Sequence, residues 1–406
     1  MNILVHHHVA SRVLFMVSQP FFQWRGSPIR VLFDVLALAA SGLMVDLLVL
    51  PVGEKKDVPG VRVIRLLNPF RIRRVPIGPS IGKAIFDVLL FFKSLRLAMK
   101  HRYDVIHAVE DAGILGLVVA RLTGAKLIFE RHSEPSAHRR GLLRNLLLFF
   151  YSKVETFTAR HADAVIGTGP GLVEQVRLMT PEKPVYHIFD IPSSLVDSSP
   201  EKSAAIRRRL VRGKDEVLAT YIGSFAVYQG VEMLFESIPL AVARRPKLRF
   251  IIIGGTAREI AARRRWLGER GIEPAVTFLG TIPPDKVPDY LRASDILISP
   301  RIAGVNTPLK LLDYLKAGRA IVATTTEANR LIVDDETALL VEPNPEALAA
   351  GVCQLAGDPE WRHRLGANGR RLIERRYNYG EFQRRLRDCY RSVLESPAPV
   401  DSSGSA

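Results

Sequence analysis

The chain has 406 residues, of which 47% are hydrophobic and 24% are charged, a balance typical of a globular protein long enough for two domains. Two cysteines exclude a disulfide framework, and no run approaches the roughly 20 apolar residues of a membrane-spanning helix. The net charge of +16 favours an anionic partner, but no nucleic-acid motif accompanies it, so nucleic acid is not the partner we expect.

Strand and helix signals alternate along the first half of the chain. Apolar runs predict strands at residues 13–17, 45–50, 61–66, 104–108, 126–130 and 164–167. Apolar periodicity predicts helices between them, at residues 28–40, 81–101, 112–123, 140–160 and 170–178. Such a β-α-β succession predicts a parallel sheet with helices on both faces.

The alternation restarts after a polar interruption, which we interpret as an inter-domain linker at residues 196–215. Strands are then predicted at residues 218–223, 249–254, 277–279, 296–299 and 320–323. We expect an α/β fold of two Rossmann-like, doubly wound parallel-sheet domains that face a cleft. The expected parts are residues 1–195, residues 216–378, a helix at 379–396 and a disordered tail at 397–406.

Loops after predicted strands of the first domain carry polar side chains. In the loop at residues 19–27, Gly26 lets backbone approach a ligand closely and Arg25 can contact an anion, although a surface turn is the alternative. A second loop follows His107 and contains Glu110. This loop could hold a titratable group in the cleft or merely acids near the positive end of a helix.

A third loop places four ionisable side chains directly after the strand predicted at residues 126–130. A histidine here, His132, can contact a leaving phosphate or a sugar hydroxyl. The alternative is a local salt-bridge cluster at the start of a helix.

Two loops of the second domain have the same position after a strand. At residues 221–230 a strand, a glycine loop containing Gly223 and a helix follow one another, which is the shape of a phosphate cradle. Gly280 and Thr281 close another strand and could flank a flat base.

The most informative segment is residues 306–323. Asn306 or Thr307 can cap a helix, and Pro308 fits the first helical position, where its missing N–H costs nothing. Leu309 starts the apolar face of this helix. The free N–H groups of the first turn favour an anion.

Lys310 and Asp313 are three residues apart, so both project from the same side of this helix near its start. A cation and a carboxylate beside an anion site suit a ligand with phosphate at one end and hydroxyls at the other. A nucleotide sugar is such a ligand.

Two basic amphipathic stretches lie at residues 85–102 and 138–160. One interpretation is a helix packed on the sheet with a solvated basic face. The other is a surface that docks to anionic lipid.

In this order the loops resemble those of retaining glycosyltransferases with the GT-B fold, in the large family 4 (glycosyl transferases group 1). The resemblance covers about residues 12–395 and is most specific where residues 221–230 are combined with residues 306–313. It implies transfer of a sugar with retention at the anomeric carbon. It also implies that the helix at 379–396 returns to the first domain.

The resemblance implies roles for individual residues. The diphosphate of the donor lies near Gly26 and Gly223 and receives N–H groups from the helix at Pro308. His132 contacts the donor sugar, and Asp313 stands where the family's second glutamate binds the ribose hydroxyls. The expected donor-binding residues are Arg25, Gly26, Gly223, Ser224, Gln229, Gly280, Thr281, Asn306, Thr307, Pro308, Leu309 and Asp313.

Three positions depart from the family pattern. Val305 stands where a glutamate is common, and Ser224 and Gln229 replace the usual arginine and lysine. Because two cations are missing beside the diphosphate, another cation has to stabilise the leaving group. We expect Lys310 to do so, with Arg301 or Arg25 as further candidates, and we name Lys310 and His132 as the catalytic residues.

We therefore expect a glycosyltransferase that moves a sugar from a nucleotide-diphosphate sugar to an acceptor, without a metal or other cofactor. The basic stretches favour a lipid-linked acceptor or surface-polysaccharide synthesis. The expected location is cytoplasmic, and a peripheral position on the inner face of the membrane stays open. Alternatives are a nucleotide-sugar epimerase or hydrolase on the same fold, using Glu130 and Glu134, and a catalytically weakened nucleotide-sugar-binding protein.

Overall fold

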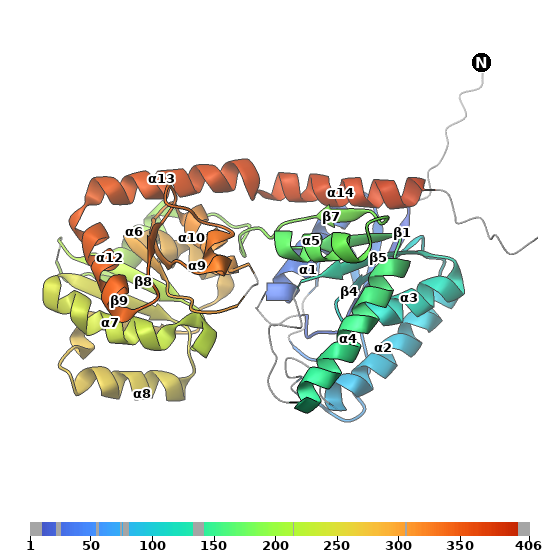
Figure 1. Cartoon of the computed structure of the whole chain (residues 1–406), viewed down its shortest axis with the longest axis horizontal. Helices are drawn as coiled ribbons and strands as arrows, with labels where there is room; N and C mark the ends of the chain where they lie inside the picture. Colours follow the sequence, from blue (N-terminus) through green and yellow to red (C-terminus); the bar gives the residue numbers. More distant parts are fainter. Residues whose placement is uncertain are drawn as a thin grey trace, which may run out of the picture. The chain divides into compact units, whose positions relative to one another are not determined.

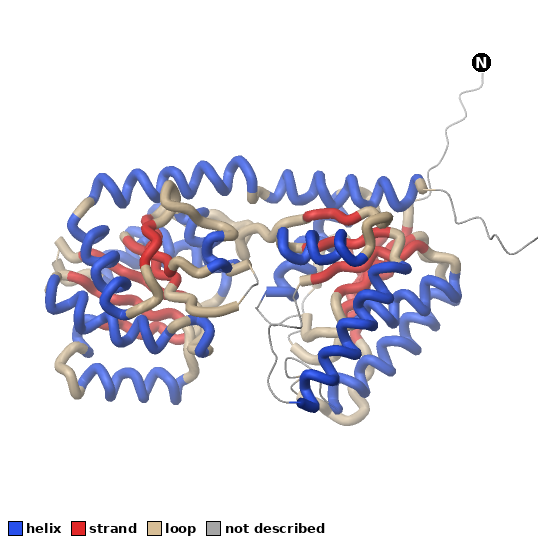
Figure 2. The backbone as a smooth tube through the Cα atoms, viewed as in Figure 1, coloured by secondary structure: helices blue, strands red, loops and turns tan. Residues whose placement is uncertain are grey.

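The computed structural model describes residues 10–21, 26–53, 57–73, 75, 81–132, 142–213, 215–304 and 307–396, with backbone alone for residues 81 and 142–148. The described residues form two compact units. The first unit contains those up to Phe189 and those from Gly380 onward, and the second unit contains Asp190–Tyr379. Figures 1 and 2 show that in each unit helices surround a layer of strands.

In the described part of the first unit, seven parallel strands form one sheet in the order β3-β2-β1-β4-β5-β6-β7. The strands are β1 (Arg12–Val17), β2 (Met44–Val49), β3 (Val61–Arg65), β4 (Val105–Val109), β5 (Lys126–Arg131), β6 (Ala164–Gly167) and β7 (Val185–His187). The helices are α1 (Gly26–Ala40), α2 (Ile81–Lys100), α3 (Ala112–Thr123), α4 (Leu142–His161), α5 (Pro170–Met179) and α14 (Tyr379–Glu395).

Strand β1 lies in the interior of this sheet, where Val13 is paired with Val45 on one side and with Val105 on the other. Its residues from Val13 to Val17 are all buried, as expected for a strand covered on both faces. The strand order reverses between β1 and β4. In such sheets ligands bind at the carboxyl ends of the strands next to this reversal.

The described part of the second unit contains six parallel strands in the order β10-β9-β8-β11-β12-β13. The strands are β8 (Val217–Ile222), β9 (Leu248–Ile253), β10 (Val276–Gly280), β11 (Ile296–Ser299), β12 (Ala320–Thr324) and β13 (Leu339–Val341). The helices are α6 (Pro200–Leu210), α7 (Val231–Arg244), α8 (Ala257–Gly268), α9 (Val287–Ala293), α10 (Leu309–Ala317), α11 (Glu327–Arg330), α12 (Pro345–Gly357) and α13 (Pro359–Arg376), with 3-10 turns η2 (Val227–Gln229), η3 (Glu273–Ala275) and η4 (Pro284–Lys286).

The segment interpreted as an inter-domain linker, residues 196–215, contains helix α6. Ser199 caps this helix by accepting from the N–H of Lys202, and the Ser199 N–H donates to Asp289 at 2.7 Å. Helix α6 also packs on α9. The polar composition of the segment therefore reflects an exposed capped helix of the second unit, which begins at Asp190.

Helix α10 begins at Leu309, one residue later than expected, with Pro308 at the N-cap position. Among the described residues no side chain caps it, so the capping expected of Thr307 is not seen. The alternative cap, Asn306, lies outside the described residues. Gly318 ends the helix at φ 64°, as its position predicts. Within the described residues, no helix combines the length and apolar character that crossing a bilayer requires.

Candidate functional site

Three neighbouring strands of the second unit end in glycine at the same edge of the sheet. Gly223 follows β8, Gly254 follows β9 and Gly280 closes β10, with φ values of 154°, 113° and 64°. The Gly223 N–H donates to the Ile253 carbonyl at 3.0 Å, and the Gly254 N–H donates to the Gly280 carbonyl at 2.7 Å. The strand ends are thus joined through backbone, with no side chains between them.

Two of these glycines have no room for a side chain. A Cβ on Gly223 would lie 2.8 Å from the Tyr221 hydroxyl and 2.9 Å from the Lys310 ammonium nitrogen. A Cβ on Gly254 would lie 2.1 Å from the Gly223 carbonyl oxygen. The sequence pattern indicated Gly223 and Gly280 as site residues but not Gly254, although Gly254 follows a strand in the same way.

Lys310, in the first turn of α10, reaches this glycine edge. Its Nζ donates to Gln229 Oε1 at 2.6 Å and lies 4.4 Å from the centre of the Tyr221 ring. The Tyr221 hydroxyl donates to the Ser224 carbonyl at 2.8 Å. The structure therefore brings Lys310, which the sequence predicted as catalytic, together with three predicted donor-binding residues, Gly223, Ser224 and Gln229.

Electrostatics make Lys310 an unusual lysine. Burial disfavours its charged form and lowers the pKa of Lys310 to about 7, with a further contribution from the nearby Arg301 guanidinium. Arg301 is itself buried, and its guanidinium lies 5.6 Å from the centre of the Tyr228 ring. An anion bound here would favour the charged form of both side chains.

Asp313 is hydrogen-bonded to Ser193, a contact that no local sequence pattern predicts. Its Oδ1 accepts from the Ser193 N–H and its Oδ2 accepts from the Ser193 hydroxyl, each at 2.7 Å. Burial raises the pKa of Asp313 to about 6, although both bonds from Ser193 oppose the shift. The carboxylate thus holds the start of the second unit against α10, and its expected bond to a ribose stays a prediction.

Three more predicted donor residues lie after β10 or at the start of α10 in the second unit. Thr281 is exposed after β10, Leu309 is half-buried at the start of α10, and Pro308 is buried. Gly26 is exposed as the first residue of α1 in the first unit. Arg25, Asn306 and Val305 lie outside the described residues.

In the first unit, Glu130 at the end of β5 is the centre of a buried charged cluster. Its Oε2 lies 2.8 Å from His107 Nε2 on β4. Its Oε1 lies 3.0 Å from Arg30 Nε on α1 and 3.1 Å from His132 Nε2. The Glu130 and His107 side chains are fully buried, and that of His132 is 6% exposed. Side chains from β4, from α1 and from the position after β5 therefore all contact the Glu130 carboxylate.

Helix α14 completes this cluster from the far end of the chain. The Tyr390 hydroxyl lies 2.8 Å from His107 Nδ1, and the ring of Phe382 lies 4.6 Å from the Arg30 guanidinium carbon. With the Glu130 carboxylate accepting at Nε2, His107 donates there and accepts from Tyr390 at Nδ1. No local sequence pattern predicts the contact of Tyr390, because His107 lies 283 residues earlier in the chain.

The cluster sets the protonation of its members. Burial alone would raise the pKa of Glu130, but Arg30 and His132 outweigh burial and hold the pKa of Glu130 well below its usual range. Burial opposes a charge on His132, yet the pKa of His132 is raised by the Glu130 carboxylate. Burial lowers the pKa of His107. A carboxylate therefore favours protonated His132, whose Nδ1 has no hydrogen-bond partner among the described residues.

A second polar cluster lies beside it, at the carboxyl ends of β1 and β4. Lys83 on α2 donates to Ser18 at 2.9 Å and pairs with Asp87 at 3.1 Å and with Asp111 at 2.7 Å. Tyr151 on α4 donates to Asp111. The spacing of Lys83 and Asp87, four residues apart in a mostly apolar helix, was the available signal for this cluster.

Comparisons with known proteins agree across both units. A family model described as "Glycosyl transferase 4-like domain" matches residues 26–192, and one described as "Glycosyl transferases group 1" matches residues 216–358. An uncharacterized glycosyltransferase of Methanocaldococcus jannaschii is 22% identical over 84% of this chain and 88% of its own length. A phosphatidyl-myo-inositol mannosyltransferase of Mycobacterium tuberculosis is 26% identical over 42% of this chain and 46% of its own. The structure of HepE from Anabaena with UDP-glucose covers 94% of this chain and 99% of its own, with TM-score 0.70 and 15% identity.

Proposed function

We propose that this chain, a glycosyltransferase with the GT-B fold, transfers a sugar from a nucleoside-diphosphate sugar to an acceptor. The transfer retains the configuration at the anomeric carbon. The observation that carries the proposal is the approach of Lys310 to the glycine edge at Gly223. There a cation, unobstructed backbone and a helix N-terminus meet, which suits a diphosphate. HepE, with a similar fold, is described in complex with UDP-glucose.

Each part has a task in the proposed reaction. The bond between the anomeric carbon and the diphosphate oxygen breaks, and negative charge builds up on the leaving nucleoside diphosphate. The acceptor hydroxyl oxygen forms the new bond to the anomeric carbon, and its proton passes to the leaving diphosphate. Lys310 and the first N–H groups of α10 stabilise that charge, while Gly223 lets the phosphates approach backbone. His132, charged by its pairing with Glu130, donates from Nδ1 to a hydroxyl of the transferred sugar.

We propose that these protein cations replace a metal ion at the diphosphate. Lys310 and Arg301 supply the charge that the family pattern usually takes from the positions of Ser224 and Gln229. Activity should then be unchanged after dialysis against EDTA. A loss that Mg²⁺ or Mn²⁺ restores would contradict this part of the proposal.

The acceptor is proposed to be lipid-linked, reached by a protein that attaches peripherally to the cytoplasmic face of the membrane. Two features support this: the basic amphipathic helices α2 and α4, and the similarity to a mannosyltransferase whose name specifies a phosphatidylinositol acceptor.

Retention at the anomeric carbon is checked separately, by NMR of the new glycosidic bond in the product.

The direct test of the proposed function is donor binding. In a thermal-shift panel of UDP-, GDP-, ADP- and TDP-sugars, a ligand at 100 times its Kd should stabilise the protein by ~2.7 kcal/mol. The stabilisation should be lost in Lys310→Ala and kept in Lys247→Ala, a lysine at the surface of the same unit whose ammonium pairs with Asp215. If no nucleotide sugar shifts the transition, the proposal fails. If sugar is isomerised or released without acceptor, the epimerase or hydrolase interpretation replaces it.

A further inference from the structure

Arg30 of helix α1 has a buried guanidinium that contacts four groups at once. Its Nε donates to Asp34 Oδ2 at 3.2 Å and lies 3.0 Å from Glu130 Oε1. Its Nη1 donates to the backbone carbonyls of Ile188 at 2.8 Å and of Phe189 at 2.9 Å. Burying a cation is costly unless its partners are well placed, and the planar fork of arginine suits several acceptors at once. A lysine ammonium cannot make all four contacts.

The two carbonyls lie in a segment through which the chain passes from one unit to the other. The first unit contains the chain up to Phe189 and again from Gly380 onward. Phe382, just after the return, places its ring 4.6 Å from the guanidinium carbon of Arg30. Arg30 therefore contacts both places where the chain crosses between the units.

Arg385 joins these two places to each other. Its Nη1 donates to the His187 carbonyl at 3.0 Å, and its guanidinium carbon lies 4.7 Å from the centre of the Phe189 ring. We call residues 187–189 and 380–385 the connecting segments. A displacement of one connecting segment therefore acts on the other as well.

On its other side, Arg30 reaches the histidine that is expected to contact the donor sugar. Glu130 Oε1 lies 3.0 Å from Arg30 Nε and 3.1 Å from His132 Nε2, so the two side chains share one carboxylate oxygen. A change in the position of the guanidinium changes how much of that oxygen is left for His132. The orientation of the imidazole ring, and with it the direction of Nδ1, depends on this shared contact.

We propose that Arg30 is a positioning residue that couples the connecting segments to His132 through the Glu130 carboxylate. When the domains of an enzyme move, the segments that connect them take up the change. Here such a change displaces the Arg30 guanidinium, alters the shared contact at Oε1 and re-aims His132 Nδ1. His132 is then correctly held only when the connecting segments adopt one arrangement. The inference rests on the proposed function in assigning His132 to the donor sugar.

The titration of His132 reports on this coupling. The charged or titratable groups around His132 are Glu130, Arg30, Asp34, Glu110 and His107. Burial opposes a charge on His132, the Glu130 carboxylate raises the pKa of His132 above its ordinary value, and the Arg30 guanidinium acts against Glu130. The experiment is an NMR titration of the ring nitrogens in the full chain labelled with ¹⁵N-histidine, in which His132→Gln identifies the signal.

Arg30→Lys keeps a positive charge but gives up part of the four contacts. The ammonium leaves more of Oε1 to His132, so the measured pKa of His132 should rise. If transfer occurs as proposed, kcat should fall by at least about tenfold while KM for the donor stays within about twofold, because Lys310 and the glycine edge are untouched.

Arg385→Gln tests the connecting segments without altering the charged cluster. Among the described residues, no ion pair or hydrogen bond joins Arg385 to Glu130 or His132. The variant removes the bond to the His187 carbonyl and the contact with the Phe189 ring. It should nevertheless shift the His132 titration, to a smaller extent than Arg30→Lys.

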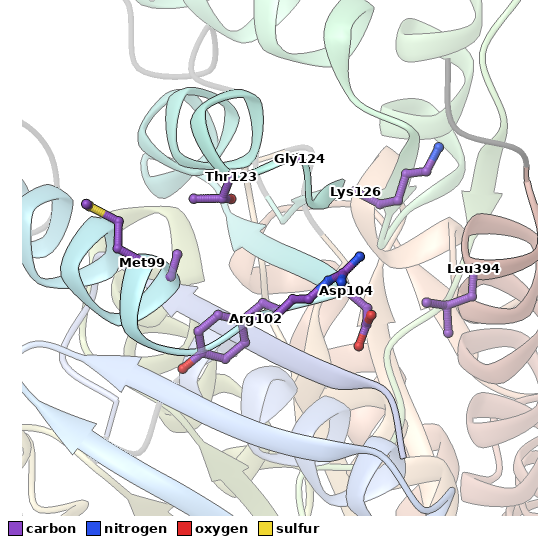
Figure 3. A pocket seen from close by; sticks show the side chains of 9 residues that line it. Met99, Arg102, Asp104, Thr123, Gly124, Lys126 and Leu394 are labelled. Carbon is purple, nitrogen blue, oxygen red and sulfur yellow. The ribbon is translucent and has the colours of Figure 1, made fainter. Parts of the chain in front are cut away.

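A control in the same unit is Arg102→Lys. Arg102 lines a hollow of about 450 Å³ at the amino ends of β4 and β5, the edge of the sheet opposite to Glu130. Figure 3 shows Arg102 between Met99 and Leu394, and its side chain makes no ion pair or hydrogen bond with any described residue. This variant should leave the His132 titration unchanged.

A control for lost stability is Arg207→Lys in the second unit. The Arg207 guanidinium also bridges a carboxylate and two carbonyls, those of Asp295, Ala293 and Glu216. Replacing it should lower the unfolding temperature and leave the His132 titration unchanged. An equal shift of the titration in this variant would overturn the proposal, because it would trace the shift to general destabilisation.

A wild-type His132 titration in Arg30→Lys and in Arg385→Gln would also overturn the proposal. If Arg30→Lys does not fold, the result for Arg385→Gln decides. Thermal stabilisation by a nucleotide sugar should persist in every variant. Its absence from the wild-type protein would contradict the proposed function, whereas the NMR titration needs no donor, so the two failures are distinguishable.

Discussion

The surroundings of the Lys310 ammonium disfavour its charged form. It is packed against the ring of Tyr221 and the side-chain oxygen of Gln229, and burial, with repulsion from Arg301, lowers its pKa to about 7. A base with a lowered pKa is charged below that value and neutral above it. In the donor-free protein the cation is therefore present below about pH 7 and is lost as the pH rises.

We expect kcat/KM for the donor to fall as the pH rises above about 7, since kcat/KM reports groups of the free enzyme. Lys310→Arg should move this fall to much higher pH, because a guanidinium stays charged. Lys310→Ala should lower kcat/KM by more than about tenfold at pH 6, or roughly 1.4 kcal/mol of transition-state stabilisation. A pH profile of Lys310→Arg that overlies the wild-type profile would show that another group titrates.

Gly223 makes a second prediction at this scale. Its φ of 154° lies outside the range that side chains readily adopt, and an added Cβ would press on Tyr221 and on Lys310. We expect Gly223→Ala to raise the Kd for the nucleotide sugar by at least about tenfold, because the diphosphate cannot approach as closely. The measurement is calorimetric titration with the donor found in the thermal-shift panel.

The matched change is Gly171→Ala on α5, where an added Cβ meets no atom within 4 Å. This variant should bind the donor like the wild type and unfold at the same temperature or slightly higher, since alanine favours a helix. Equal donor affinity in both glycine variants would remove Gly223 from the donor site.

At the scale of elements, α14 is held to the first unit by a polar contact as well as by packing. Phe382, Leu386 and Tyr390 are buried, and the Tyr390 hydroxyl bonds His107, which in turn bonds Glu130. Removing that hydroxyl leaves a buried ring nitrogen of His107 without a donor. Buried polar groups that lose their partner cost about 1–3 kcal/mol.

Tyr390→Phe should therefore lower the free energy of unfolding by about 1–2 kcal/mol in urea denaturation. The control is Tyr290→Phe on α9, because the Tyr290 hydroxyl makes no hydrogen bond to a described residue; its effect should stay within about 0.5 kcal/mol. If the two variants were equally stable, the Tyr390 bond to His107 would contribute nothing measurable.

Local patterns in the sequence predicted much of this arrangement, and what they missed depends on distant contacts. Apolar runs followed by glycine or polar residues place Gly223 and His132 at strand ends, each at the carboxyl edge of its own parallel sheet. Spacing along a helix places Lys310 near the start of α10. The hydrogen bond from Ser193 to Asp313 joins residues 120 positions apart, and no sequence pattern near either residue predicts it. Polar composition likewise cannot separate a linker from a capped, exposed helix such as α6.

At the scale of the whole molecule, the last helix, α14, supplies the final part of the first unit. The second unit, Asp190–Tyr379, contains Gly223, Gln229 and Lys310 within one continuous stretch of chain. The first unit is discontinuous and takes its final element from residues after Tyr379. Loss of that element should therefore affect the two units differently.

A chain that ends at Tyr379 should keep the second unit folded and lose the first. Burying a large apolar side chain contributes about 1.5–3 kcal/mol, and α14 buries Phe382, Leu386, Cys389, Tyr390 and Val393. Their combined loss is comparable with the 5–15 kcal/mol that stabilises an ordinary domain. Limited proteolysis followed by mass spectrometry should show rapid cleavage before residue 190 and a protected fragment after it. That fragment should still be stabilised against thermal unfolding by the nucleotide sugar.

A chain ending at Ser396 keeps α14 and should resist proteolysis like the full-length protein. Equal protection of the first unit in both shortened chains would show that its core does not need α14.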